Sequence, residues 1–149
     1  MKARISNQIT KKIFHGILLT IITLFVVSCV NTVPFLTSPV VPAATGTVKI
    51  KKDDNQNYAI KVQVENLAEV ERLQSSKQMY IVWMETERGN AENLGQLNSS
   101  SGFMSKKLSA SLETVSSFKP VRFFVTTEFT RNVRYPGSEE ILTTDRFYK

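Results

Sequence analysis

Residues 79–86 read Met-Tyr-Ile-Val-Trp-Met-Glu-Thr, and this segment is the strongest indication of the fold class. Its first six residues are apolar or aromatic, which is typical of a β-strand covered on both faces. We expect the indole of Trp83 to be buried in the core against facing strands, because a ring of that size gains most from leaving water. A ligand platform is the alternative role for Trp83.

Upstream of this strand, the sequence predicts a β-hairpin. Apolar and polar residues alternate over residues 46–52 and again over residues 58–65, with Asp-Asp-Asn-Gln-Asn at residues 53–57 between them. Two period-2 runs around an Asp/Asn turn indicate paired antiparallel strands. Residues 67–77 break this alternation with helical spacing, which predicts a short helix or turn there.

Downstream, similar segments recur with turns between them. We expect strands at residues 93–97, 107–113, 121–128 and 141–143, with a polar loop after the first of these. Together with the segments above, they predict a single Ig-like antiparallel β-sandwich of about seven strands over residues 46–149.

Residues 29–45 contain three prolines and lack a clear period. Proline disfavours helices and sheet interiors, so the segment is predicted to be an extended tether that reaches roughly 55 Å at about 3.3 Å per residue. In the alternative interpretation, Val40 and Val41 pair as a first edge strand.

The first 28 residues have the organisation of a signal peptide. Four basic residues and no acidic residue precede or flank an apolar run at residues 13–27, which is shorter than the roughly 20 residues that a membrane-spanning helix requires. Residues 26–29, Val-Val-Ser-Cys, resemble a bacterial lipobox. This resemblance implies cleavage after Ser28 and lipid attachment at Cys29; an uncleaved membrane anchor is the alternative.

The lipobox resemblance also implies a cellular location. Lipobox cysteines carry several acyl chains, and two or more chains give stable membrane attachment. Val30 follows Cys29 where an aspartate would favour inner-membrane retention, so we expect a cell-envelope protein in the outer membrane. The membrane itself is therefore one expected partner.

Counting residues restricts the chemistry of the mature chain. The formal net charge is +6, but residues 1–28 carry +4 of it, and the rest has 15 basic against 13 acidic side chains. Hence no basic patch predicts nucleic-acid binding. After cleavage the chain would have no histidine and no free thiol, which excludes Ser-His-Asp and Cys-His catalysis and a Cys/His zinc site. We therefore predict no catalytic residues, no metal and no cofactor.

The segment from Met79 to about Thr143 resembles the C-terminal extracytoplasmic domain of anti-sigma-K factors. The matching residues are Tyr80-Ile81-Val82-Trp83-Met84, Gly89, Asn93-Leu94-Gly95-Gln96-Leu97, Val125-Thr126-Thr127-Glu128 and Tyr135-Pro136-Gly137. The family's Glu-Pro-Gly-Gly run is replaced here by Glu-Phe-Thr-Arg at residues 128–131. The resemblance implies an envelope-side β domain, whereas the chain shows neither a sigma-binding domain nor a spanning helix.

Two acidic motifs have ordinary alternatives. Asp53, Asn55 and Asn57 match the first three ligand positions of a calcium loop, but the required Gly and Glu are absent, so a hairpin turn is favoured. Carboxylates end two predicted strands; they could converge at one rim as a glycoside-hydrolysing pair, or they could be solvated strand ends. These residues are Glu85, Glu87 and Glu128.

The best candidate contact surface is a segment rich in arginine and aromatic residues, which are enriched at protein interfaces. It contains Phe129, Arg131, Arg134 and Tyr135. The sequence thus predicts a lipid-anchored, non-catalytic interaction or sensing module with an envelope protein as its possible partner. The alternatives are a structural surface component without a defined ligand and a carboxylate-only hydrolase.

Overall fold

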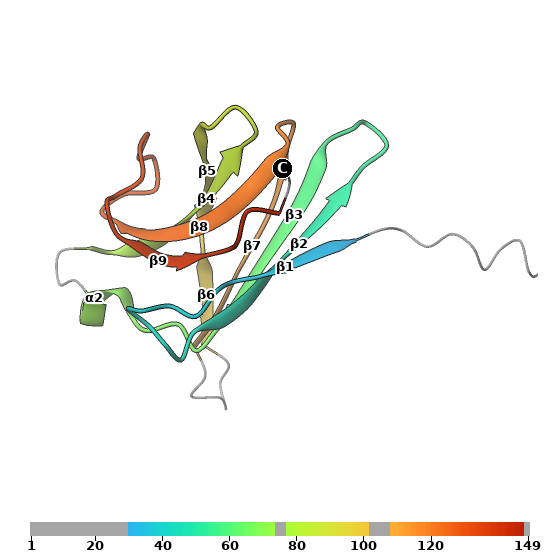
Figure 1. Ribbon diagram of the computed structural model, residues 1–149. Coiled ribbons are helices and arrows are strands. Elements are labelled where there is room, and N and C mark those ends of the chain that lie inside the picture. Colours follow the sequence, from blue (N-terminus) through green and yellow to red (C-terminus); the bar gives the residue numbers. More distant parts are fainter. Residues whose placement is uncertain (1–29, 74–76, 102–107, 148–149) are drawn as a thin grey trace, which may run out of the picture.

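The computed structural model describes residues 30–73, 77–101 and 108–147 and shows two antiparallel β-sheets (Figure 1). One sheet has the strand order β1-β2-β3-β7-β6, and the other has the order β5-β4-β8-β9. The elements are β1 (Asn31–Pro34), β2 (Thr45–Lys52), β3 (Tyr58–Glu65), α2 (Val70–Leu73), β4 (Met79–Thr86), β5 (Ala91–Gln96), β6 (Asn98–Ser101), β7 (Leu108–Ser116), β8 (Pro120–Glu128) and β9 (Glu140–Thr143). The predicted all-β sandwich is therefore confirmed, with nine strands in the described residues instead of about seven.

The strand order is that of an immunoglobulin-like sandwich. Strands β2, β3, β7 and β6 occupy the A, B, E and D positions of that fold, and β4, β8 and β9 occupy C, F and G. Strand β5 adds a fourth strand beside β4, and β1 adds a strand beside β2. Residues 98–101, which belong to the segment expected to be a loop, instead form β6 and pair with β7.

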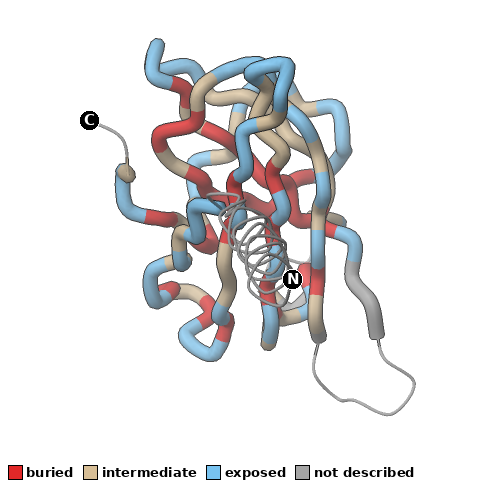
Figure 2. Tube along the Cα trace, turned by 90° about the vertical axis from the view of Figure 1, so that its right-hand side faces the viewer, coloured by how far each residue is buried: buried red, intermediate tan, exposed pale blue. Residues whose placement is uncertain are grey.

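The core lies between the sheets, and the buried segments gather inside the molecule (Figure 2). Along β2 and β3, buried residues alternate with more exposed ones. In the predicted hairpin, Val48 pairs with Val62 and Ile50 pairs with Ile60, so the apolar positions of both strands share the buried face. Full burial of each such side chain contributes about 1.5–3 kcal/mol. The turn is also as predicted: the carboxylate of Asp53 accepts hydrogen bonds from the backbone N–H groups of residues 55 and 57.

Strand β4 is covered on both faces, as its sequence predicts. Val82 and Met84 contribute to the core between the sheets. Trp83 is fully buried but points the other way, and forms a second apolar cluster with Ile81 and Phe124. The expectation that Trp83 packs against the facing sheet is therefore wrong: its cluster lies on the outer face of the four-stranded sheet.

The predicted tether is also wrong, because residues 31–44 belong to the sandwich. Strand β1 pairs with β2 along its length. The Leu36 N–H then donates to the Thr143 carbonyl at 2.8 Å, and the Ser38 hydroxyl donates to the Ile141 carbonyl at 2.5 Å. This segment therefore crosses from one sheet to the other.

The prolines are compatible with this arrangement because an edge strand has N–H groups that need no ladder partner. Pro34 ends β1 at such an edge, opposite Thr47. Val40 and Val41 lie outside any strand, so the edge-strand alternative for them is wrong too, although Val41 is buried in the core. The predicted signal peptide and Cys29 lie outside the described residues. No helix in the described part of the chain is long and apolar enough to cross a membrane.

Candidate functional site: a braced loop on the outer sheet face

The four predicted contact residues lie in one loop, residues 129–139, which joins β8 to β9 (Figure 1). Tyr135 is 78% exposed and Phe129 is 53% exposed, although both are large aromatic residues. Arg131 and Arg134 are exposed as well. The loop therefore presents two aromatic rings and two guanidinium groups to solvent.

The middle of the loop is held against the sheet by Asn93 of β5. Its side-chain amide donates to the carbonyl of Arg131 at 3.0 Å and to the carbonyl of Val133 at 2.9 Å. The Asn93 side-chain oxygen accepts the N–H of Gly95 at 2.9 Å, and Gly95 has a φ of 123°, a conformation that favours glycine. Val133 packs against the apolar cluster around Trp83. The loop thus has both a polar and an apolar attachment.

A series of hydrogen bonds from Trp83 through Thr126 and Glu128 to Gly137 fixes the ends of the loop. The indole N–H of Trp83 donates to the Thr126 hydroxyl at 2.9 Å, and that hydroxyl donates to Oε1 of Glu128 at 2.6 Å. The N–H of Gly137 donates to the same carboxylate oxygen at 2.7 Å. Glu128 is only 4% exposed, and Nζ of Lys77 lies 3.6 Å from its other oxygen. Glu128 therefore connects the buried cluster to the far end of the loop.

The four predicted contact residues differ in whether their side chains interact with other parts of the protein. Arg131 donates to the side-chain oxygen of Gln96 at 3.1 Å, and Nζ of Lys77 lies 4.2 Å from the ring centroid of Phe129. Arg134 and Tyr135 make no hydrogen bond or ion pair to any residue that the structure describes. These two side chains are therefore the ones most available to a partner.

The proposed carboxylate pair does not converge. Strands β4 and β8 are neighbours, but they run antiparallel: Glu85 lies opposite Arg122, whereas Glu128 lies opposite Met79. Six residues of strand separate these positions, or about 20 Å at roughly 3.3 Å per residue. Glycoside hydrolysis requires carboxylates within about 10 Å. The alternative in which Glu85 and Glu128 form one catalytic rim is therefore wrong.

Glu85 and Glu128 are not solvated strand ends either. Glu85 accepts from Nε of Arg122 at 3.0 Å and forms a second ion pair with Arg146. Arg122 also makes a bidentate contact to Glu140, at 2.9 and 3.0 Å. This network ties β4, β8 and β9 together. The described residues contain no cluster of three or more metal-ligating His, Cys, Asp or Glu side chains.

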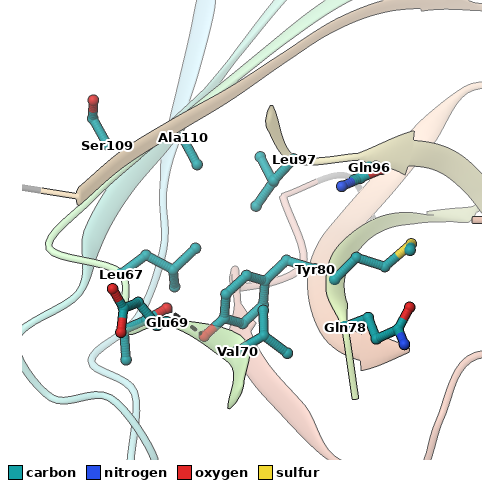
Figure 3. Close-up of a pocket in the computed structure, with 11 residues that line it drawn as sticks. Leu67, Glu69, Val70, Gln78, Tyr80, Gln96, Leu97, Ser109 and Ala110 are labelled. Carbon is teal, nitrogen blue, oxygen red and sulfur yellow. Dashed lines mark hydrogen bonds between the residues drawn. The ribbon is translucent and has the colours of Figure 1, made fainter. Parts of the chain in front are cut away.

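A small recess lies where the segment leading into α2 meets β4, β5 and β7 (Figure 3). Its volume is about 170 Å³, close to that of a cavity that holds one benzene ring. Leu67, Val70 and Leu97 form much of its apolar wall, and the hydroxyl of Tyr80 donates to the Ala68 carbonyl beside it. The recess is therefore too small for a drug-sized ligand, which needs roughly 300 Å³ or more.

The sequence identified the exposed side chains of this site but not its supports. Asn93 was notable only as part of the Asn-Leu-Gly-x-Leu motif, and its contacts to the loop cross about 40 residues of chain. Comparison with protein-family models, with curated proteins and with solved structures gives no match. The resemblance to anti-sigma-K factors therefore stays a prediction.

Proposed function

We propose that this protein is a lipid-anchored envelope protein whose sandwich binds another protein, without catalysis, through residues 129–135. The observation that supports this proposal is the loop itself: exposed Arg134 and Tyr135 project from a backbone that Asn93 and Glu128 hold in place. Loops on a rigid scaffold commonly carry binding residues. Because the loop is held before binding, less conformational entropy is lost when a partner docks.

The chemistry of the loop defines the partner. Arg131 and Arg134 bring positive charge to a surface that also exposes Phe129 and Tyr135, whereas the ammonium group of Lys77 is paired with the Glu128 carboxylate. Such a surface fits an envelope protein that presents carboxylates beside an apolar patch, because opposite charges steer the encounter and aromatic anchors supply affinity.

Replacing Arg134 with Glu together with Tyr135 with Ala is expected to weaken partner capture by at least 30-fold, the effect of losing a hot spot of about 2 kcal/mol. Photo-crosslinking in cells, followed by mass spectrometry and titration of the captured protein, measures this effect. Arg88→Glu is the matched control, because Arg88 is exposed in the turn after β4, at the opposite end of the sheet. Unchanged capture by the double variant would exclude this loop, and capture of no specific protein would favour a structural envelope role.

The anchor has its own test. Cys29→Ala is expected to release the protein from the membrane fraction or to leave it unprocessed, because the acyl chains have no other attachment site. Fractionation and intact-mass measurement detect both results. Val30→Ala keeps the cysteine and is expected to remain lipidated and membrane-bound. Normal membrane retention of a processed Cys29→Ala variant would contradict the lipobox interpretation.

A further inference from the structure

The membrane anchor and the folded domain are separated by almost no chain. Strand β1 begins at Asn31, so only Val30 stands between the domain and Cys29. One residue spans at most about 3.6 Å. If Cys29 is acylated, the part of the sandwich next to Val30 must therefore lie at the bilayer surface.

The surface next to Val30 has the composition of a membrane contact. A shallow depression on the outer face of the five-stranded sheet is lined by Val30 together with residues of β2, β3 and β7. Val30 is 47% exposed and Val115 is 61% exposed, so two apolar side chains are left in solvent there. The basic side chains that line the depression are Lys49, Lys51 and Lys61.

The charge of this surface remains positive after internal pairing. Among the described residues that line the depression, Glu113 is the acidic one, and it forms an ion pair with Lys61 at 2.5 Å. Lys49 and Lys51 are exposed and have no ion pair with any described residue. Basic side chains close to a bilayer are attracted to anionic headgroups, and their aliphatic stems can lie along the interface beside apolar side chains.

We propose that this lysine–valine face, defined by Val30, Lys49, Lys51, Lys61 and Val115, lies against anionic phospholipid of the membrane that holds Cys29. The inference rests on the lipid anchor of the proposed function. It fixes the orientation of the domain. The loop at residues 129–139 is on the other sheet, and it follows the end of β8 that lies farthest from Val30, so it is directed away from the bilayer (Figure 1).

The test uses the full lipidated protein with Val115→Cys, labelled with an environment-sensitive fluorophore and reconstituted into vesicles of phosphatidylethanolamine and 30% phosphatidylglycerol. Headgroup-proximal spin-labelled lipid is expected to quench this label strongly. A label at Ser138→Cys, exposed in the loop, is the matched control and is expected to stay unquenched. In phosphatidylcholine vesicles, quenching at position 115 should fall.

Charge variants make the test quantitative. Lys49→Gln and Lys51→Gln are each expected to lower the ratio of membrane-docked to undocked domain, measured by quenching at position 115, about fivefold. This is the contribution of one basic residue near an anionic surface. Intact mass separates the two possible failures. If Cys29 is acylated but the labels at positions 115 and 138 are quenched equally, or neither label is quenched, this orientation alone is overturned. If Cys29 is not acylated, both the anchor and this inference are overturned.

Discussion

Replacing Trp83 with alanine is expected to lower the free energy of unfolding by about 3–5 kcal/mol, the usual cost of removing a buried aromatic side chain. The indole is fully buried, its ring lies 6.2 Å from that of Phe124 in a stacked arrangement, and its N–H donates to Thr126. Alanine leaves a cavity on the outer sheet face and removes the donor that faces the Thr126 hydroxyl. Domains of this size are stable by about 5–15 kcal/mol, so the loss is a large fraction of the total.

Urea unfolding followed by far-ultraviolet circular dichroism measures this loss without relying on tryptophan fluorescence. Trp83→Phe retains a ring that can stack on Phe124, so it should lose less stability than Trp83→Ala. Phe118→Ala is the surface control, because Phe118 is an exposed aromatic residue in the turn before β8 and should change stability by less than about 0.5 kcal/mol. A loss below about 1 kcal/mol for Trp83→Ala would show that the outer cluster does not contribute as a core.

The position of Trp83 shows what the hydrophobic pattern of the sequence predicts and what it leaves open. Alternation places Trp83 on the face opposite Val82 and Met84, and the continuous apolar run correctly predicts that both faces are covered. Because both faces are apolar, the pattern does not specify which one meets the second sheet. On the outer face, Trp83 is covered in part by the loop at residues 129–139, about 50 residues downstream. Val133 is the residue of this loop that packs against the cluster around Trp83.

The remaining errors have a similar physical origin. Prolines at residues 34–42 argue against a sheet interior, but they are tolerated at an edge and in the segment that follows it. The serine-rich β6 has the composition of a loop, and its strand conformation comes from pairing with β7. Glu85 and Glu128 both end strands, yet antiparallel pairing sends the two ends to opposite rims. In each case the deciding contact is with another segment of the chain, whereas composition and period report only the preference of the segment itself.

Removing the Glu128 carboxylate is expected to loosen the contact loop although the residue is not on the contact surface. In Glu128→Ala, the Gly137 N–H and the Thr126 hydroxyl both lose their acceptor, and Lys77 loses its counter-ion. Hydrogen bonds to a charged group contribute about 1.5–3 kcal/mol each, so losing both is expected to lower the free energy of unfolding by about 3–6 kcal/mol. Amide hydrogen exchange of residues 129–139 should quicken more than that of β3, because the loop end is released first.

This variant also separates preorganisation from direct contact. If affinity depends on a loop held in place before binding, Glu128→Ala should weaken partner capture at a temperature where the sandwich remains folded, although Arg134 and Tyr135 are intact. Glu128→Gln, which keeps one acceptor oxygen, should fall between the wild type and Glu128→Ala. Glu87→Ala is the control, because Glu87 is exposed and its ion pair with Lys119, at 3.4 Å, is a surface contact that contributes little to stability. Unaltered exchange at Gly137 in Glu128→Ala would mean that Asn93 and Val133 suffice to hold the loop, and the binding surface would then depend on β5 and not on β8.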